Sequence, residues 1–241
     1  MVLLFREGAR PDAEAVRTLA RATAAFNVSH DPGLNPGAVE GEGNWLELLM
    51  SGLTFDLRGL GGAEPADIPP LRHKFGLDEL MEGVEGVSLD AGPHLAGCGN
   101  MMPIVRSQLA LSLQLATLPG LVAVAWAPSR SAMAVNYFTS LVSAWLAGGA
   151  FPALGLTAFA IAADGGLQSE GLSFLIGQEL RREPDLTEDG VAATKLAVRL
   201  VNELVEHGRV TERLEMTGPD GAPLILEPSA NRAFVRVWPG E

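Results

Sequence analysis

The chain of 241 residues is long enough to bury one large hydrophobic core or two smaller ones. Its 47 % hydrophobic and 19 % charged residues are typical of globular proteins and exclude a largely disordered chain. The net charge of −12 repels phosphate groups and no basic stripe interrupts it, so we expect no binding to nucleic acid.

Hydrophobic periodicity and turn residues predict strands and short helices in the N-terminal part. A glycine-, proline- and asparagine-rich loop is expected over 29–44. In chain order the predicted elements are a strand over 2–5, a helix over about 11–25, hairpin strands over 45–50 and 53–57, a short helix over 77–81 and a strand over 87–89.

The middle of the chain is almost free of charge, since Arg130 is the only charged residue between Ser107 and Ala163. The run is long enough for a membrane span, which needs about 20 apolar residues. Gly148, Gly149 and Pro152 interrupt the run, however, and its polar side chains would lie in lipid. We therefore predict no membrane span. Instead we expect a buried central strand over 121–127, flanked by helices over 103–118 and 132–147.

The C-terminal part shows strand patterns separated by turn residues, and one long amphipathic helix. The sequence Asp185-x-x-Glu188 is typical of a capping box, which predicts a helix from there to about Glu206. The predicted strands cover about 154–162, 171–180, 210–217, 223–227 and 232–238.

These elements predict an α+β fold with mixed or antiparallel sheets and helices packed on them. Residues 121–217 follow the βαββαβ order of a ferredoxin-like sandwich. Residues 2–90 can be given the same order, which is compatible with a degenerate duplication. We expect one compact unit over 1–241, with sub-units 1–90 and 121–241 joined by the helix 103–118 as the alternative.

Cysteine content and the N-terminal sequence bear on the cellular location. Cys98 is the only cysteine, so no disulfide can form within the chain. The apolar stretch at 2–5 is too short for the hydrophobic region of a signal peptide. We expect a cytoplasmic protein without a cofactor, and the sequence does not predict its oligomeric state.

The most reactive stretch of the sequence is His94-Leu-Ala-Gly-Cys98-Gly-Asn100. A histidine and a cysteine before a helix N-terminus favour a thiolate, which makes His94 and Cys98 candidate catalytic residues and Asn100 a candidate ligand-binding residue. A structural zinc site needs four ligands, and the other histidines lack metal-binding spacing, so no metal site is predicted. The alternative is a glycine-rich connection with an incidental thiol.

Ser129 and Arg130 follow the predicted buried strand, where loops of open α/β sheets often hold ligands. Arg130 is a candidate for binding a carboxylate or phosphate beside the N–H groups of the next helix. The alternative is a solvated turn. Glu42, Glu47 and Asp56 are interpreted as ordinary loop and hairpin charges.

Three segments resemble a bacterial domain-of-unknown-function family, the one numbered 4261. They are VAVAWAPSRSAM at 122–133, the Gly171–Leu180 segment GLSFLIGQEL, and the helix-plus-hairpin end from Leu186 to Trp238. The resemblance covers the C-terminal half of the chain. It implies a bacterial protein and assigns no catalytic residue.

Two functions are compatible with the sequence. The first is a non-catalytic domain, of the adaptor or immunity type, whose acidic surface steers it onto a basic protein partner. The second is a small-molecule enzyme with a site near His94, Cys98 and Arg130, which requires those side chains to converge in a concave pocket.

Overall fold

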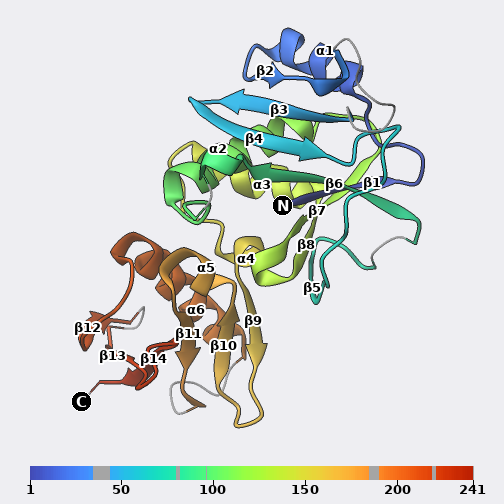
Figure 1. The fold of residues 1–241 in the computed structure, drawn as a ribbon. Coiled ribbons are helices and arrows are strands. Elements are labelled where there is room, and N and C mark those ends of the chain that lie inside the picture. The colour runs from blue at the N-terminus through green and yellow to red at the C-terminus, as the bar shows by residue number, and fades with distance from the viewer. Residues whose placement is uncertain (35–43, 80–81, 96, 185–189, 219–220, 241) are drawn as a thin grey trace. The chain divides into compact units, whose positions relative to one another are not determined.

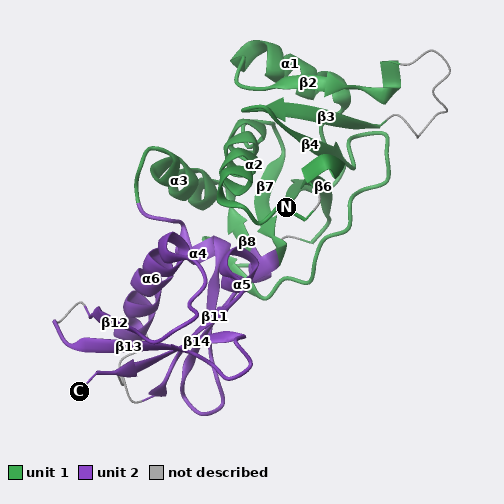
Figure 2. Ribbon diagram, turned by 60° about the vertical axis from the view of Figure 1, so that its left-hand side comes forward, with its two compact units in different colours: residues 1–127, 132–149 green, residues 128–131, 150–241 purple. Residues whose placement is uncertain are grey.

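The protein is described by a computed structural model with two mixed sheets and helices packed on them, which confirms the predicted α+β class (Figure 1). The structure describes residues 1–34, 44–79, 82–95, 97–184, 190–218 and 221–240. The chain divides into two compact units (Figure 2). Unit 1 comprises residues 1–127 and 132–149, and unit 2 comprises residues 128–131 and 150–241.

Unit 1 is built on an eight-stranded sheet of order β2-β3-β4-β6-β1-β7-β8-β5. Its strands are β1 (Val2–Arg6), β2 (Asn27–His30), β3 (Trp45–Met50), β4 (Leu53–Arg58), β5 (His73–Phe75), β6 (Val84–Ala91), β7 (Leu121–Trp126) and β8 (Ser131–Ala134). The helices are α1 (Ala13–Thr23), α2 (Met102–Leu115) and α3 (Val135–Leu146), with short 3-10 turns at Pro32–Leu34 and Pro93–Leu95. A third 3-10 turn, Ala127–Ser129, begins in unit 1 and ends in unit 2.

The two faces of this sheet differ because side chains alternate along each strand. One face is apolar and packs against helices: Leu46 and Leu48 of β3 are fully buried, α2 contacts β4 and β6, and α3 contacts β7. On the other face, Leu71 and Leu77 from the segment between β4 and β6 cover Val2 and other residues of β1 and β7. The part of that face over β3, β4 and β6 also carries charged side chains, among them Glu47, Asp56 and Asp90.

Arg10 fixes the start of the segment that follows β4. Its Nη1 donates to the carbonyl oxygens of Gly59, Leu60 and Ala63 at 2.6, 2.9 and 3.0 Å. Its Nε donates to Glu85 of β6 at 3.1 Å. Gly59 has a φ of +81°, and a Cβ there would lie 2.7 Å from the Ala66 nitrogen, so only glycine fits this turn.

Glu85 links the stability of unit 1 to pH. The Arg10 side chain, and next the Gly8 N–H, lower the pKa of Glu85 below its ordinary value of 4.5. A carboxyl whose pKa is lower in the folded state stabilises the protein above its unfolded pKa and loses that effect as the pH falls through the folded value. We therefore expect Glu85→Gln to lower the urea midpoint at neutral pH. The difference from wild type should vanish in acid, and a difference that persists there would contradict this role.

The charge-poor middle of the chain forms much of the unit 1 core, as predicted. β7 is an inner strand between β1 and β8, and Trp126 is 2 % exposed. Phe138 and Val142 of α3 are fully buried. None of the helices in the described residues is long and apolar enough to cross a membrane.

Unit 2 is built on a six-stranded sheet of order β12-β13-β14-β11-β10-β9. Its strands are β9 (Ala158–Ile161), β10 (Leu167–Glu170), β11 (Glu179–Arg182), β12 (Leu214–Thr217), β13 (Pro223–Pro228) and β14 (Phe234–Pro239). Its helices are α4 (Ala153–Leu156), α5 (Leu172–Ile176) and α6 (Gly190–His207), and α6 contacts β10 and β11. All strand pairs in this sheet are antiparallel except β11 with β14.

The structure corrects the predicted grouping of elements. The strand over 121–126 pairs with β1 in unit 1 and not with the strands that follow Ala158, so 121–217 is not one ferredoxin-like sandwich and not a folded repeat of 2–90. The predicted linker helix is α2, which packs on β4 and β6 inside unit 1. The unit boundary therefore lies near residue 150, and not between 90 and 121.

Several predicted elements also change type. The segment 171–180 holds the helix α5 and the start of β11, with Gly171 and Gly177 left-handed at the helix ends. Residues 131–134 form β8 before α3 begins. The capping box at 185–188 and the end of the predicted helix 77–81 lie outside the described residues, as does most of the loop 29–44.

Candidate functional site

The stretch around Cys98 lies on the surface of unit 1. The His94 ring contacts Thr54 Oγ1 through Nε2 at 3.2 Å. Cys98 and Asn100 are exposed, and the Cys98 N–H donates to the Leu95 carbonyl in a turn. No hydrogen bond joins His94 to Cys98 in the described part of the chain.

Ser129 and Arg130 belong to unit 2, so the structure assigns the predicted site residues to two different units. Ser129 is buried and donates to the Gly155 carbonyl at 2.9 Å. Arg130 forms an ion pair with Glu170 at the end of β10. Ser131 also donates to the Gly155 carbonyl, at 2.5 Å. These contacts hold the turn in unit 2 and leave the charge of Arg130 balanced.

Glu179 organises a second polar cluster in unit 2. Its carboxylate accepts hydrogen bonds from the N–H groups of Gly171, Leu172 and Ser173 at 2.9, 3.2 and 3.1 Å. It also accepts from the hydroxyls of Ser169 and Ser173 at 2.5 and 2.6 Å. The first N–H groups of a helix have no acceptor within the helix, and here Glu179 accepts from them. The role of Glu179 is therefore structural.

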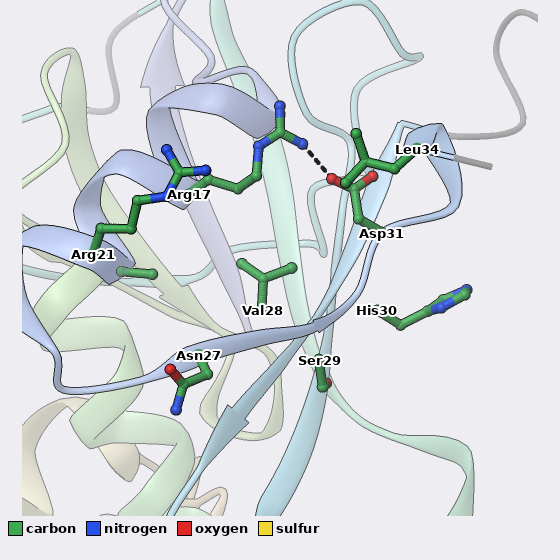
Figure 3. A pocket seen from close by; sticks show the side chains of 9 residues that line it. Arg17, Arg21, Asn27, Val28, Ser29, His30, Asp31 and Leu34 are labelled. Carbon is green, nitrogen blue, oxygen red and sulfur yellow. Dashed lines mark hydrogen bonds and ion pairs between the residues drawn. The ribbon is translucent and has the colours of Figure 1, made fainter. Parts of the chain in front are cut away.

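A hollow of about 420 Å³ lies between α1 and β2 in unit 1 (Figure 3). Arg17 forms ion pairs with Asp31 and Glu14, and Arg21 pairs with Glu14 at 3.2 Å. The hydrogen bond from Arg17 lowers the pKa of Glu14. In Figure 3 the His30 ring points away from the Arg17–Asp31 pair. The guanidinium groups of Arg17 and Arg21 are both paired with carboxylates, so this hollow is poorly suited to binding an anionic ligand.

Three carboxylates stand in a row on the polar face of the unit 1 sheet. Glu47 of β3 lies directly opposite Asp56 of β4, and Asp56 lies directly opposite Asp90 of β6. Directly opposite side chains in antiparallel strands have their Cβ atoms about 4.5–5.5 Å apart. We call Glu47, Asp56 and Asp90 the acidic row.

Asp56 is the buried centre of the acidic row. Its side chain is 9 % exposed, and its Oδ2 accepts from Arg58 at 2.7 Å. Its Oδ1 is buried and has no hydrogen-bond partner among the described residues. A buried carboxylate oxygen without a donor is costly, because it has lost its water and gained nothing in exchange.

The ends of the acidic row are more accessible than its centre. Glu47 accepts from the Ser29 hydroxyl at 2.7 Å. Asp90 is 57 % exposed and lies 3.4 Å from the Met1 ammonium group. Beside the row, the Arg58 guanidinium stacks over the Trp45 ring at 4.4 Å, and the His30 ring lies 5.6 Å from the same ring. No group of three or more His, Cys, Asp or Glu in the described residues is placed to hold a metal ion.

Comparison with protein-family models, with curated proteins and with solved structures finds no match for this chain. The resemblance to the family numbered 4261 therefore stays a prediction. The site has to be argued from its own geometry, and the acidic row is the arrangement that packing does not explain.

Proposed function

We propose that the protein is a non-catalytic module that binds a protein partner, and that the acidic row receives basic side chains of that partner. The observation that carries the proposal is the row itself. At its centre is the Oδ1 of Asp56, to which none of the described residues donates a hydrogen bond. A net charge of −12 would steer a basic partner toward the protein before contact.

The energetics of the row support a role in binding. Like charges directly opposite each other destabilise a sheet by a few tenths to about 1 kcal/mol per pair. Two cations offset only part of this. Arg58 bonds one oxygen of Asp56 and is itself half exposed, and the Met1 ammonium group lies 3.4 Å from Asp90. A guanidinium or ammonium group laid across Glu47 and Asp90 would add the missing positive charge.

The geometry suits a side chain better than a compact ion. Neighbouring strands lie about 4.8 Å apart, so the row from β3 to β6 spans about 10 Å. A guanidinium donates several N–H groups in a plane and can bridge carboxylates at such spacing. Trp45 and the aliphatic part of Arg58 offer a surface beside the row against which an arginine stem can pack.

The test measures the binding of a labelled oligo-arginine peptide by fluorescence anisotropy at low salt. We expect the double variant Glu47→Gln, Asp90→Asn to bind about tenfold more weakly, which corresponds to about 1.4 kcal/mol. A peptide with citrulline in place of arginine is the uncharged control and should not bind.

The matched control variant is Glu64→Gln, Asp67→Asn, which removes the same charges from exposed positions elsewhere in unit 1. It should bind the peptide like wild type. Equal losses in the two double variants would show that only the net charge matters and would refute a site at the acidic row.

A further inference from the structure

The outer strand β9 of unit 2 differs from the other sheet edges. An exposed edge strand presents unpaired N–H and C=O groups to any other strand, and proteins protect such edges with charges, bulges or covering elements. Of the four outer strands described, β5 carries Lys74 and β12 carries Glu215, while β2 is bulged between Val28 and His30.

β9 has only four residues, but it carries neither a charge nor a bulge. Its sequence is Ala-Phe-Ala-Ile, it pairs with β10 in regular register, and no further strand of the described residues pairs with its other edge. Ile161, the last residue of β9, is 73 % exposed. Figure 1 shows β9 at the border of the unit 2 sheet.

We propose that β9 pairs with β9 of a second copy of this chain, in antiparallel orientation about a two-fold axis. A second copy fits because the strand carries no charge in a chain of net charge −12. Two copies would repel each other wherever acidic surfaces meet, and β9 is an edge where the two backbones approach without opposing carboxylates.

Side-chain alternation determines the register of this pairing. Directly opposite residues of an antiparallel pair must lie on the same face, and Phe159 and Ile161 share one face. With Ala160 opposite its own copy, each Ile161 comes to lie opposite the partner copy's Phe159. This produces two aromatic–β-branched pairs, which are favourable cross-strand pairs, and covers the exposed isoleucine.

An apolar groove lies between α6 and α4, the helix that precedes β9. The groove has a volume of about 450 Å³ and is lined by Leu154 of α4 and by Val191, Thr194, Lys195 and Val198 of α6. Only one residue separates the end of α4 from the start of β9. Val191, on the α6 side of the groove, is 63 % exposed.

Sedimentation equilibrium over a wide concentration range tests the proposal. We expect the mass of the wild-type protein to rise from 25.3 kDa toward twice that value. Ile161→Lys should remain monomeric at concentrations where wild type is mostly dimeric, because pairing would bury the ammonium group. Thr217→Lys, which adds the same charge to the edge strand β12, should dimerise like wild type. Circular dichroism would confirm that both variants fold.

Cross-linking tests the register. In a Cys98→Ser background, Ala160→Cys should form a disulfide-linked dimer under mild oxidation, because opposite Cα atoms lie about 4.5–5.5 Å apart, within disulfide reach. Met216→Cys on β12 should not. A monomeric wild type at all concentrations, a dimer that Ile161→Lys leaves intact, or a dimer that Ala160→Cys fails to cross-link would each overturn the proposal.

Discussion

Replacing Phe138 by alanine should lower the free energy of unfolding of unit 1 by about 3–5 kcal/mol. The ring is fully buried in α3, the helix that packs on α2 and β7. Its removal leaves a cavity that the surrounding core fills only in part. Since a domain has only about 5–15 kcal/mol of stability, the loss should be plain in urea denaturation followed by circular dichroism.

Ser140→Ala is the matched control for this substitution, because Ser140 lies on the exposed side of the same helix. Its free energy of unfolding should stay within about 0.5 kcal/mol of wild type. If Phe138→Ala unfolded at the same urea concentration as Ser140→Ala, the charge-poor run would not be the core that holds unit 1 together.

Replacing Glu179 by alanine should lower the free energy of unfolding of unit 2 by about 2–4 kcal/mol, because it leaves several donors without acceptors. Three N–H groups at the start of α5 and the buried Ser169 hydroxyl lose their carboxylate. Native-state hydrogen exchange should report the effect directly, as faster exchange of the amides of Gly171, Leu172 and Ser173.

The control for this substitution is Glu215→Ala on β12, whose side chain is 77 % exposed. It should leave exchange in α5 unchanged and alter stability little. Unchanged protection of the α5 amides in Glu179→Ala would show that water replaces the carboxylate without cost, and that the cluster is not what orders this turn.

The parts of the fold that were predictable are those set by local pattern. The uncharged run 121–127 could only be a buried strand, and the turn at Ser51-Gly52 specified a hairpin that the structure shows as β3 and β4. The α1 helix was visible from its periodicity, and it begins after Asp12, whose carboxylate accepts from the Ala15 N–H.

The parts that were not predictable depend on distant residues. The apolar run Leu172–Ile176 has a strand-like composition, yet it is helical because Glu179 accepts from its first N–H groups. The strand β8 pairs with the edge of β7, and the short sequence Ser-Ala-Met-Ala does not specify that pairing. Sheet membership of the strand 121–126 likewise depended on β1, more than a hundred residues earlier.

The acidic row was partly visible in the sequence. A two-residue turn at Ser51-Gly52 places Glu47 opposite Asp56, so their pairing follows from the hairpin register alone. Interpreting both as ordinary hairpin charges overlooked this. Asp90 could not be added, because its place opposite Asp56 depends on the pairing of β4 with β6 across a long intervening segment.

The most direct test of a binding site at the acidic row is chemical-shift mapping of the ¹⁵N-labelled protein during titration with the oligo-arginine peptide. We predict that the amide signals that move most belong to β3, β4 and β6 around Glu47, Asp56 and Asp90, and that these shifts disappear in Glu47→Gln, Asp90→Asn. Shifts scattered over both units, or unchanged by that double variant, would contradict the proposed function.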